Sequence, residues 1–438
     1  MKFISTRGKS KAVTFLEAAE TGLAPDGGLY MPDSFPSTDF TAEFDSADPV
    51  ASLREVAKRC SRPFLSGSLS PQEIDSLIED AINFDAPLVQ LSEKRYVLEL
   101  FHGPTLAFKD FGARFMARLF SAHRTASDKD LVILVATSGD TGGAVANGFF
   151  HLPGVHVCLL YPKGKVSNVQ RKQMTTLGKN ITALEINGTF DDCQKLVKTA
   201  FSDRNLNRDL RLSSANSINI ARLLPQSFYY LHAVTQLKAS GESAPVFIVP
   251  SGNFGNLTAG LFAREMGLPV HSFVAATNRN DVVPEFLEGK AYSPRASIQT
   301  ISNAMDVGNP SNFDRIRHLF QGDDELIRRE ITGYAFDDDS TQEMIRQVFD
   351  EFGYTADPHT AVGLLAEKEY RKAISESVPA VVLSTAHPSK FPDVVEEETG
   401  RKIETPHRLK KATEKREKSI PLQADYDTLK GFLENRYG

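Results

Sequence analysis

Short apolar runs alternate with amphipathic segments from Asp130 onward, and no other feature limits the possible folds as strongly. The run LVILVA at 131–136 precedes a glycine-rich turn and a helical pattern, and VHVCLLYP at 155–162 and ITALEI at 181–186 repeat this order. Runs rich in β-branched residues that alternate with helical segments are typical of βαβ units, in which helices cover both faces of a parallel sheet. The sequence therefore predicts an α/β fold with mainly parallel strands.

A second group of predicted strands lies further along, at 244–250, 270–277 and 380–383. A long mixed segment separates the last two, so a single sheet built in chain order does not fit. At 438 residues the chain also exceeds the roughly 250–300 residues at which single cores stop growing. We expect two parallel-sheet α/β domains with a cleft between them.

The two ends of the chain differ from this pattern. Residues 1–80 are expected to form an N-terminal α+β domain, in which Ser70 before Pro71, with Glu73 in the first turn, marks the start of a helix. Residues 81–405 are the expected catalytic region. In the last part, 406–438, the charged run at 407–422 is expected to be a solvated linker and 425–438 a terminal helix.

Bulk composition excludes several classes of partner. A formal net charge of −6 gives no broad basic field for nucleic acid or an anionic membrane. No run approaches the roughly 18 apolar residues of a membrane span. Three widely spaced cysteines, Cys60, Cys158 and Cys193, indicate reduced thiols and a cytoplasmic protein.

Two glycine-rich turns each follow an apolar run and precede a helix. They are TSGDTGGA at 137–144 and PSGNFGNLTAG at 250–260. Converging backbone N–H groups at a helix start can hold a phosphate, although a tight turn without a ligand would look the same. Neither turn has the Walker or GxGxxG spacing, which argues against a nucleotide-dependent oxidoreductase.

A third segment, SSANSINIARLLPQ at 213–226, is rich in short polar residues. Asn216, Ser217, Asn219 and Arg222 could together bind a phosphate or carboxylate, with a two-pronged contact from the arginine. The alternative is a helix cap with a surface arginine. After the strand at 380–383, Ser384 or Thr385 could point a hydroxyl into the cleft, and His387 is expected in a turn.

Lys109 lies in FHGPTLAFKDFGARFM, where many neighbours are apolar. A lysine next to Asp110 is most often half of a solvated charge pair. An apolar setting instead lowers the pKa of a lysine and frees its amine, as a Schiff base requires. Both interpretations stay open on this segment alone.

Several motifs taken together resemble the threonine synthase family, pyridoxal-phosphate enzymes of the tryptophan-synthase-β-like fold type II group. The similarity extends over essentially the whole chain. Its motifs are ISTRG, APDGGLYMP, HGPTLAFKDFGARF, TSGDTGGA, PSGNFGN, ISNAMDVGNPSNFDR and STAHPSKF.

The resemblance implies a role for each candidate residue. It implies that Lys109 carries pyridoxal phosphate as a Schiff base and that Thr385 bonds the pyridine nitrogen. It implies that a backbone cup holds the cofactor phosphate, with the residues Gly252, Asn253, Phe254, Gly255 and Asn256. The pocket for the substrate's own phosphate would consist of Ser138, Thr141, Asn216, Ser217, Asn219 and Arg222.

Asp140 departs from the pattern of the wider group. Many relatives have asparagine beside the phenolic oxygen of the cofactor, in SGNTG, whereas this chain has SGDTG. Longer microbial and fungal threonine synthases look similar here, so Asp140 is interpreted as a feature of the subgroup. The partner of that oxygen stays open.

The implied reaction converts O-phospho-L-homoserine and water to L-threonine and phosphate, by γ-elimination and β-hydration, in the last step of threonine biosynthesis. The resemblance also implies a monomer, and we expect a smaller mobile subdomain at about 110–230. Two alternatives remain. One is a phosphate-eliminating lyase that yields a 2-oxo acid, and the other is a binding protein that has lost catalysis, against which an intact Lys109 argues.

Overall fold

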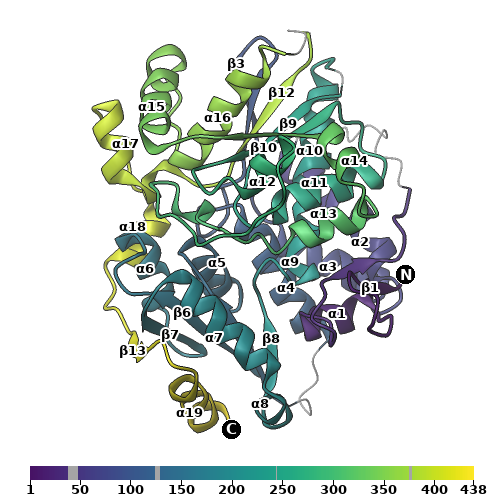
Figure 1. Ribbon diagram of the computed structural model, residues 1–438, viewed down its shortest axis with the longest axis vertical. Helices are drawn as coiled ribbons and strands as arrows, with labels where there is room; N and C mark the ends of the chain where they lie inside the picture. Colours follow the sequence, from purple (N-terminus) through teal and green to yellow (C-terminus); the bar gives the residue numbers. More distant parts are fainter. Residues whose placement is uncertain (38–47, 124–128, 243, 374–376) are drawn as a thin grey trace.

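The computed structural model describes residues 1–37, 48–123, 129–242, 244–373 and 377–438. In these residues the strands form two large sheets and a small one, and the two large sheets lie one above the other in Figure 1. The six-stranded sheet has the order β11-β10-β9-β12-β4-β3, and the five-stranded sheet has the order β13-β7-β6-β5-β8. All their described pairs are parallel except β3 with β4, which confirms the predicted pair of α/β bodies.

The strand bounds follow the predicted apolar runs closely. The six-stranded sheet contains β3 (Leu88–Ser92), β4 (Arg95–Glu99), β9 (Val246–Pro250), β10 (Ser272–Thr277), β11 (Ile331–Ala335) and β12 (Ala380–Ser384). The five-stranded sheet contains β5 (Leu131–Ala136), β6 (Val155–Pro162), β7 (Ile181–Asn187), β8 (Arg211–Ser214) and β13 (Ile420–Gln423).

Helices cover both faces of each large sheet. Along β9, Val246 and Ile248 belong to one apolar cluster while Phe247 and Val249 belong to another, as expected for a strand buried on both sides. The first cluster contains α15 (Asp338–Phe352) and α16 (Pro358–Tyr370), and the second contains α10 (Ser227–Ala239) and α11 (Gly255–Glu265). The five-stranded sheet packs against α4 (Lys109–His123), α5 (Asp140–Gly148), α7 (Phe190–Ser202) and α19 (Tyr426–Tyr437).

Outside the N-terminal unit, the remaining described helices are short and connect these layers. They are α6 (Asn168–Thr175), α8 (Arg204–Asp209), α9 (Ile220–Leu223), α12 (Val282–Leu287), α13 (Phe313–Leu319), α14 (Asp324–Glu330), α17 (Pro392–Thr399) and α18 (His407–Thr413), with the 3₁₀ turns η1 (Leu224–Gln226), η2 (Asn303–Met305) and η3 (Pro388–Lys390).

The N-terminal unit has the expected α+β composition. The antiparallel pair β1 (Phe3–Ser5) and β2 (Tyr30–Pro32) accompanies α1 (Phe15–Thr21), α2 (Pro49–Leu65) and α3 (Pro71–Ala81). Ser70 and Glu73 form a capping box at the start of α3, which confirms the predicted helix start. The core of this unit is continuous with the main core, since the ring of Phe15 lies 6.4 Å from that of Phe115.

The prediction of a solvated linker at 407–422 is wrong in part. Helix α18 packs against α6, and β13 joins the five-stranded sheet beside β7. The strand has only four residues and follows a charged run, so it gives little signal, although Leu422 packs against the apolar cluster of this sheet. The predicted terminal helix is confirmed as α19, which buries Leu429 and Leu433.

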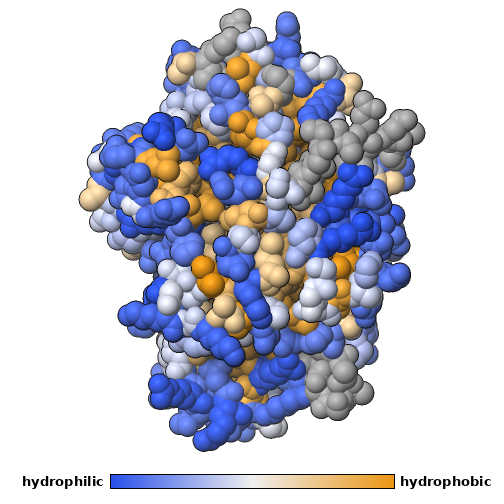
Figure 2. Space-filling view, turned by 90° about the vertical axis from the view of Figure 1, so that its right-hand side faces the viewer, coloured by the Kyte–Doolittle hydropathy of each residue, from blue (hydrophilic) through white to orange (hydrophobic). Residues whose placement is uncertain are grey.

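The surface carries no large apolar area on the face drawn in Figure 2, where apolar residues form separate patches among polar ones. Among the described helices, none is long and apolar enough to cross a membrane. Cys60, Cys158 and Cys193 are buried and unpaired, and burial raises the pKa of each thiol to about 12. All three are therefore inert packing residues.

Candidate active site

A cavity lies between the two large sheets, at the carboxyl ends of β5, β8, β9 and β12, where ligands of open α/β sheets bind. Most of the predicted site residues line it. They are Lys109, Ser138, Asp140, Thr141, Asn216, Ser217, Arg222, Gly252, Asn253, Phe254, Gly255, Asn256 and Thr385. Residues from five separate segments thus meet in one place.

The loop before Lys109 is attached to the segment after β12. Ala107 forms an antiparallel bridge with Ala386, Phe108 N donates to Thr385 O at 2.9 Å, and His387 N donates to Leu106 O at 3.1 Å. Leu106 adopts a left-handed conformation with φ 61°, which is rare for a branched side chain. The loop therefore fixes Lys109, the first residue of α4, beside Thr385 at the cavity.

Lys109 is not a solvated surface charge. Burial lowers the pKa of its amine to about 8, an effect that Lys390 and Arg222 reinforce and Asp140 opposes. Asp110 points away from it and accepts hydrogen bonds from Thr105 N at 2.8 Å and Thr105 Oγ1 at 2.7 Å. The neighbouring aspartate thus shapes the loop, and the amine is left facing the cavity.

The turn after β9 presents backbone donors to the cavity. Phe254, at φ 58°, precedes α11 without a side-chain cap, and the N–H groups from 252 to 256 have no acceptor among the described residues. Added to the positive end of α11, these donors suit a phosphate. A Cβ on Gly252 would lie 2.7 Å from Met305 Cα, so the turn admits only glycine there.

The asparagine side chains of this turn are engaged elsewhere. Asn253 Nδ2 donates to Ser217 Oγ at 2.6 Å, and Asn253 Oδ1 accepts from Ser311 N at 2.6 Å. Asn256 Nδ2 donates to Pro250 O at 2.8 Å. Both side chains therefore help to build the cup, and its main-chain N–H groups are available to a ligand.

Arg222 places a buried positive charge at the cavity. It is 3% exposed, it donates to Ala215 O, and none of its described contacts within 4 Å is with a carboxylate. Asn216 and Ser217 lie beside it along the lining. An unneutralised guanidinium with amide and hydroxyl groups nearby is suited to a second anion, separate from the backbone cup.

Asn219 is the one predicted site residue that does not line the cavity. Its Oδ1 accepts from Ala221 N at 3.0 Å as the N-cap of α9, while its Nδ2 donates to Ala19 O at 2.7 Å and Ser214 O at 2.8 Å. The side chain has no donor left for a ligand. The structure therefore departs from the prediction: Asn219 supports the segment and does not line the cavity.

Of Ser384 and Thr385, only Thr385 lines the cavity. Ser384 Oγ lies 2.7 Å from Thr360 Oγ1, away from the cavity, whereas Thr385 lines it. His387 accepts a hydrogen bond from Ser389 N at 3.1 Å at the start of η3, which confirms its role in a turn.

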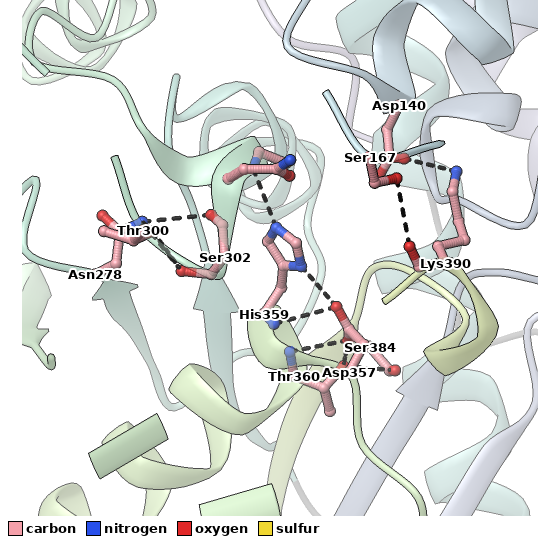
Figure 3. Close-up of polar contacts among 12 residues, drawn as sticks. Asp140, Ser167, Asn278, Thr300, Ser302, Asp357, His359, Thr360, Ser384 and Lys390 are labelled. Carbon is pink, nitrogen blue, oxygen red and sulfur yellow. Dashed lines mark hydrogen bonds and ion pairs between the residues drawn. The ribbon is translucent and has the colours of Figure 1, made fainter. Parts of the chain in front are cut away.

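Two further residues at the site were not predicted, and Figure 3 shows both. Lys390, in the quoted segment STAHPSKF, forms a buried ion pair with Asp140. His359, in DPHTAVG, lines the cavity; its Nδ1 lies 2.6 Å from Asp357 Oδ2, and its Nε2 accepts from Ala304 N at 3.2 Å. Since Nε2 accepts, the proton lies on Nδ1 and is donated to Asp357.

His359 is expected to matter for cofactor retention, because its bond to Ala304 fixes the segment that covers Gly252. His359→Phe removes both hydrogen bonds of the ring, to Ala304 N and to Asp357. It should weaken binding of the pyridoxal phosphate that the resemblance implies by about tenfold or more. Equilibrium dialysis measures this. The exposed His271→Phe is the matched control, and an unchanged dissociation constant in His359→Phe would show that the bond does not support the cup.

Comparisons with known proteins agree with this geometry. A family model described as pyridoxal-phosphate dependent enzyme matches residues 83–386. Models described as threonine synthase N terminus and threonine synthase, C-terminal match 2–82 and 360–433. A threonine synthase from Escherichia coli K12 is 43% identical over 436 residues, which cover 99% of this chain and 100% of that protein.

Two solved structures extend the similarity to three dimensions. The crystal structure of threonine synthase from Escherichia coli has a TM-score of 0.89 at 42% identity and covers 99% of this chain and 100% of that one. A pyridoxal-phosphate-bound threonine synthase from Brucella melitensis has a TM-score of 0.89 at 36% identity, with 100% and 99% covered.

Proposed function

Because this chain belongs to the threonine synthase family of pyridoxal-phosphate-dependent enzymes, we propose that it converts O-phospho-L-homoserine and water to L-threonine and phosphate. One observation carries the proposal: a lysine amine with a lowered pKa faces a cavity that has two separate groups of anion donors. The cofactor and the substrate each bring a phosphate, so the reaction needs two such groups.

The residues present fit pyridoxal phosphate. The free N–H groups at 252–256 would hold its phosphate, Lys109 would bind it covalently, and the Thr385 hydroxyl would meet its ring nitrogen. When bound, the cofactor supplies an electron sink for negative charge that develops on the substrate. A hydroxyl beside the ring nitrogen, in place of a carboxylate, favours an unprotonated nitrogen.

Lys109 is proposed as the general base. At pH 7 about a tenth of its amines are unprotonated if the pKa is about 8. A lysine released from the cofactor would take the proton from the substrate α-carbon and would pass it on to the conjugated system of cofactor and substrate. The amine, free again, would then take the proton from the β-carbon that allows the γ-phosphate to leave. No other amine lines the cavity among the described residues.

Arg222, Asn216 and Ser217 are proposed to hold the substrate phosphate, with the hydroxyls of Ser138 and Thr141 on the facing loop. All five line the cavity, and Asn253 ties Ser217 to the cofactor cup through a 2.6 Å hydrogen bond. Asn219 takes part only by capping α9. The two phosphate positions are thus coupled by direct contact.

Arg222→Gln should lower kcat/KM for O-phospho-L-homoserine about 10- to 100-fold, because charge-assisted hydrogen bonds to a phosphate are lost. Steady-state kinetics measure this, with Arg264→Gln at the far end of α11 as the matched control. Cofactor content should stay at the wild-type level. An unchanged kcat/KM would show that Arg222 does not bind the substrate phosphate.

A phosphate-eliminating lyase that yields a 2-oxo acid is the alternative, and product analysis separates the two. The purified protein with O-phospho-L-homoserine should form L-threonine and phosphate in equal amounts, measured by chromatography and a phosphate assay. Formation of a 2-oxo acid in place of threonine would contradict the proposal.

The smaller α/β body is proposed to close over the substrate. It contains the five-stranded sheet, whose last strand β13 comes from outside the expected range 110–230. Closure would exclude water from reactive intermediates. A phosphonate analogue of the substrate should reduce the radius of gyration in small-angle scattering, and identical profiles would count against closure. The resemblance also supports a cytoplasmic location and a monomer. Light scattering, which gives the mass of the particle in solution, tests the monomer.

A further inference from the structure

A second buried lysine lies beside the site, and the proposed reaction gives it no role. Lys390 is the last residue of η3, a short way beyond Thr385. Its Nζ lies 2.6 Å from Asp140 Oδ1 and donates to Thr105 O at 3.0 Å. The side chains of Lys390 and Asp140 are 0% and 2% exposed, so the pair is shielded from solvent.

Two side chains hold Asp140 in place, and Figure 3 shows its contact with the first of them, Lys390. The second is Gln170, whose Nε2 donates to the same Oδ1 at 2.9 Å and whose Oε1 accepts from Asn303 Nδ2 at 3.3 Å. Asp140 begins α5 in the smaller body, whereas Lys390 and Asn303 belong to the larger one. The carboxylate is therefore fixed at the seam between the two bodies, on the wall of the cavity that Lys109 also lines.

A buried carboxylate in the same cavity as a reactive lysine presents a chemical difficulty. Charges in a low-dielectric site attract strongly, so an unpartnered Asp140 would stabilise the ammonium form of Lys109. An ammonium group can neither form a bond with a carbonyl carbon nor accept a proton. Asp140 therefore needs another cation if Lys109 is to react at neutral pH.

We propose that Lys390 is a positioning residue for Lys109: by pairing with Asp140, it prevents that carboxylate from capturing the Lys109 ammonium and so leaves the Lys109 amine free. The inference rests on the proposed function only in taking Lys109 as the reacting amine. The proposal also explains how this chain can have Asp140 where many relatives have asparagine. The ion pair of Asp140 with Lys390 has no net charge, as an asparagine side chain has none.

The effects of the surrounding charges on the pKa of Lys109 have the signs that the proposal requires. Asp140 raises the pKa of Lys109 and Lys390 lowers it, while among the other groups that act on it Arg222 lowers and Asp357 raises it. The Lys390 ammonium holds the pKa of Asp140 well below its usual range, so the carboxylate stays charged. His359 also lines the cavity, and its ring is engaged with Asp357 and Ala304 N.

The test is the titration of Lys109 itself in the full-length protein freed of its cofactor. Competitive labelling with acetic anhydride over pH 6–11, read by mass spectrometry of the Lys109 peptide, gives the pH at which the amine is half protonated. In Lys390→Met this pH should rise by about one unit or more, because Asp140 loses its cation. In Asp140→Asn it should fall, because the charge of Lys390 is no longer balanced.

The double variant Asp140→Asn/Lys390→Met should return the half-titration pH to near that of the wild type, and so should the conservative Lys390→Arg. The double variant removes both charges together, so it keeps the test informative if a single variant does not fold. Lys430→Met, which breaks an ion pair with Asp203 far from the cavity, should change nothing.

An unchanged half-titration pH in Lys390→Met would overturn the proposal, and so would a double variant that titrates like either single one. Since this readout requires no cofactor and no substrate, it is independent of whether the reaction proposed above is correct. Wild-type protein that formed no threonine, while the variants still shifted as expected, would refute the function and leave the role of Lys390 standing.

Discussion

Lys109→Ala will lose threonine formation by at least about 10³-fold, because it removes both the covalent anchor of the cofactor and the general base. The pKa of this amine is lowered to about 8 because burial disfavours its charged form. Removing the amine should therefore not lower the free energy of unfolding. Steady-state kinetics of phosphate release measure the effect. The visible absorption of the linked cofactor should disappear as well.

Lys238→Ala is the control for this variant, since Lys238 lies exposed in the last turn of α10. It should retain full activity. Added methylamine should restore part of the activity of Lys109→Ala by supplying the missing base, whereas it should not affect the control. If Lys109→Ala kept more than about a tenth of wild-type activity, Lys109 would not have both roles.

Arg315→Met should lower the free energy of unfolding by about 3 kcal/mol, because it leaves several buried acceptors without a donor. Arg315 is 0% exposed and donates to Tyr30 O, Ser217 O and Ile218 O at 3.1, 3.1 and 2.6 Å. It therefore joins the N-terminal unit to the segment proposed to bind the substrate phosphate. Chemical denaturation measures the loss.

The same variant should raise KM for the phosphorylated substrate, since the carbonyl groups of Ser217 and Ile218 lose their support. Arg329→Met is the matched control, because Arg329 is largely exposed in α14 and its ion pair with Glu330 is 3.8 Å long. A loss of stability equal to that of the control would show that Arg315 does not stabilise this junction.

The main strands could be predicted because they are buried on both faces. Every residue of β5 and β9 is buried, so these strands read as continuous apolar runs that stand out from the flanking turns. Strand β13 was not predicted, because it lies at a sheet edge with Ile420 exposed and is held by main-chain pairing. Of its four residues, only Leu422 packs against the apolar cluster, so the strand has no apolar run that would identify it.

The glycine turns of the site could be predicted because their shape restricts the residue type. Gly252 has no room for a Cβ, and this requirement is visible in the sequence. Lys390 and His359 gave no such signal, since their importance arises only from distant contacts. The acceptor Thr105 O is 285 residues from Lys390, and Ala304 N is 55 residues from His359.

Asn219 shows a different limit. In a segment with Asn216, Ser217 and Arg222, all four polar residues could face a ligand as far as spacing tells. Only the position where α9 begins decides that Asn219 becomes its N-cap and turns inward. Composition could thus indicate an anion site, but the helix start selects which side chains form it.

The most direct measurement is the identity of the lysine that carries the cofactor. Reduction of the purified holoenzyme with borohydride, followed by proteolysis and mass spectrometry, should place the pyridoxyl group on the peptide that contains Lys109. The protein offers a natural internal comparison in Lys390, which is also buried within the site. A label on Lys109 alone is the expected result, and a label on Lys390, or on neither, would contradict it.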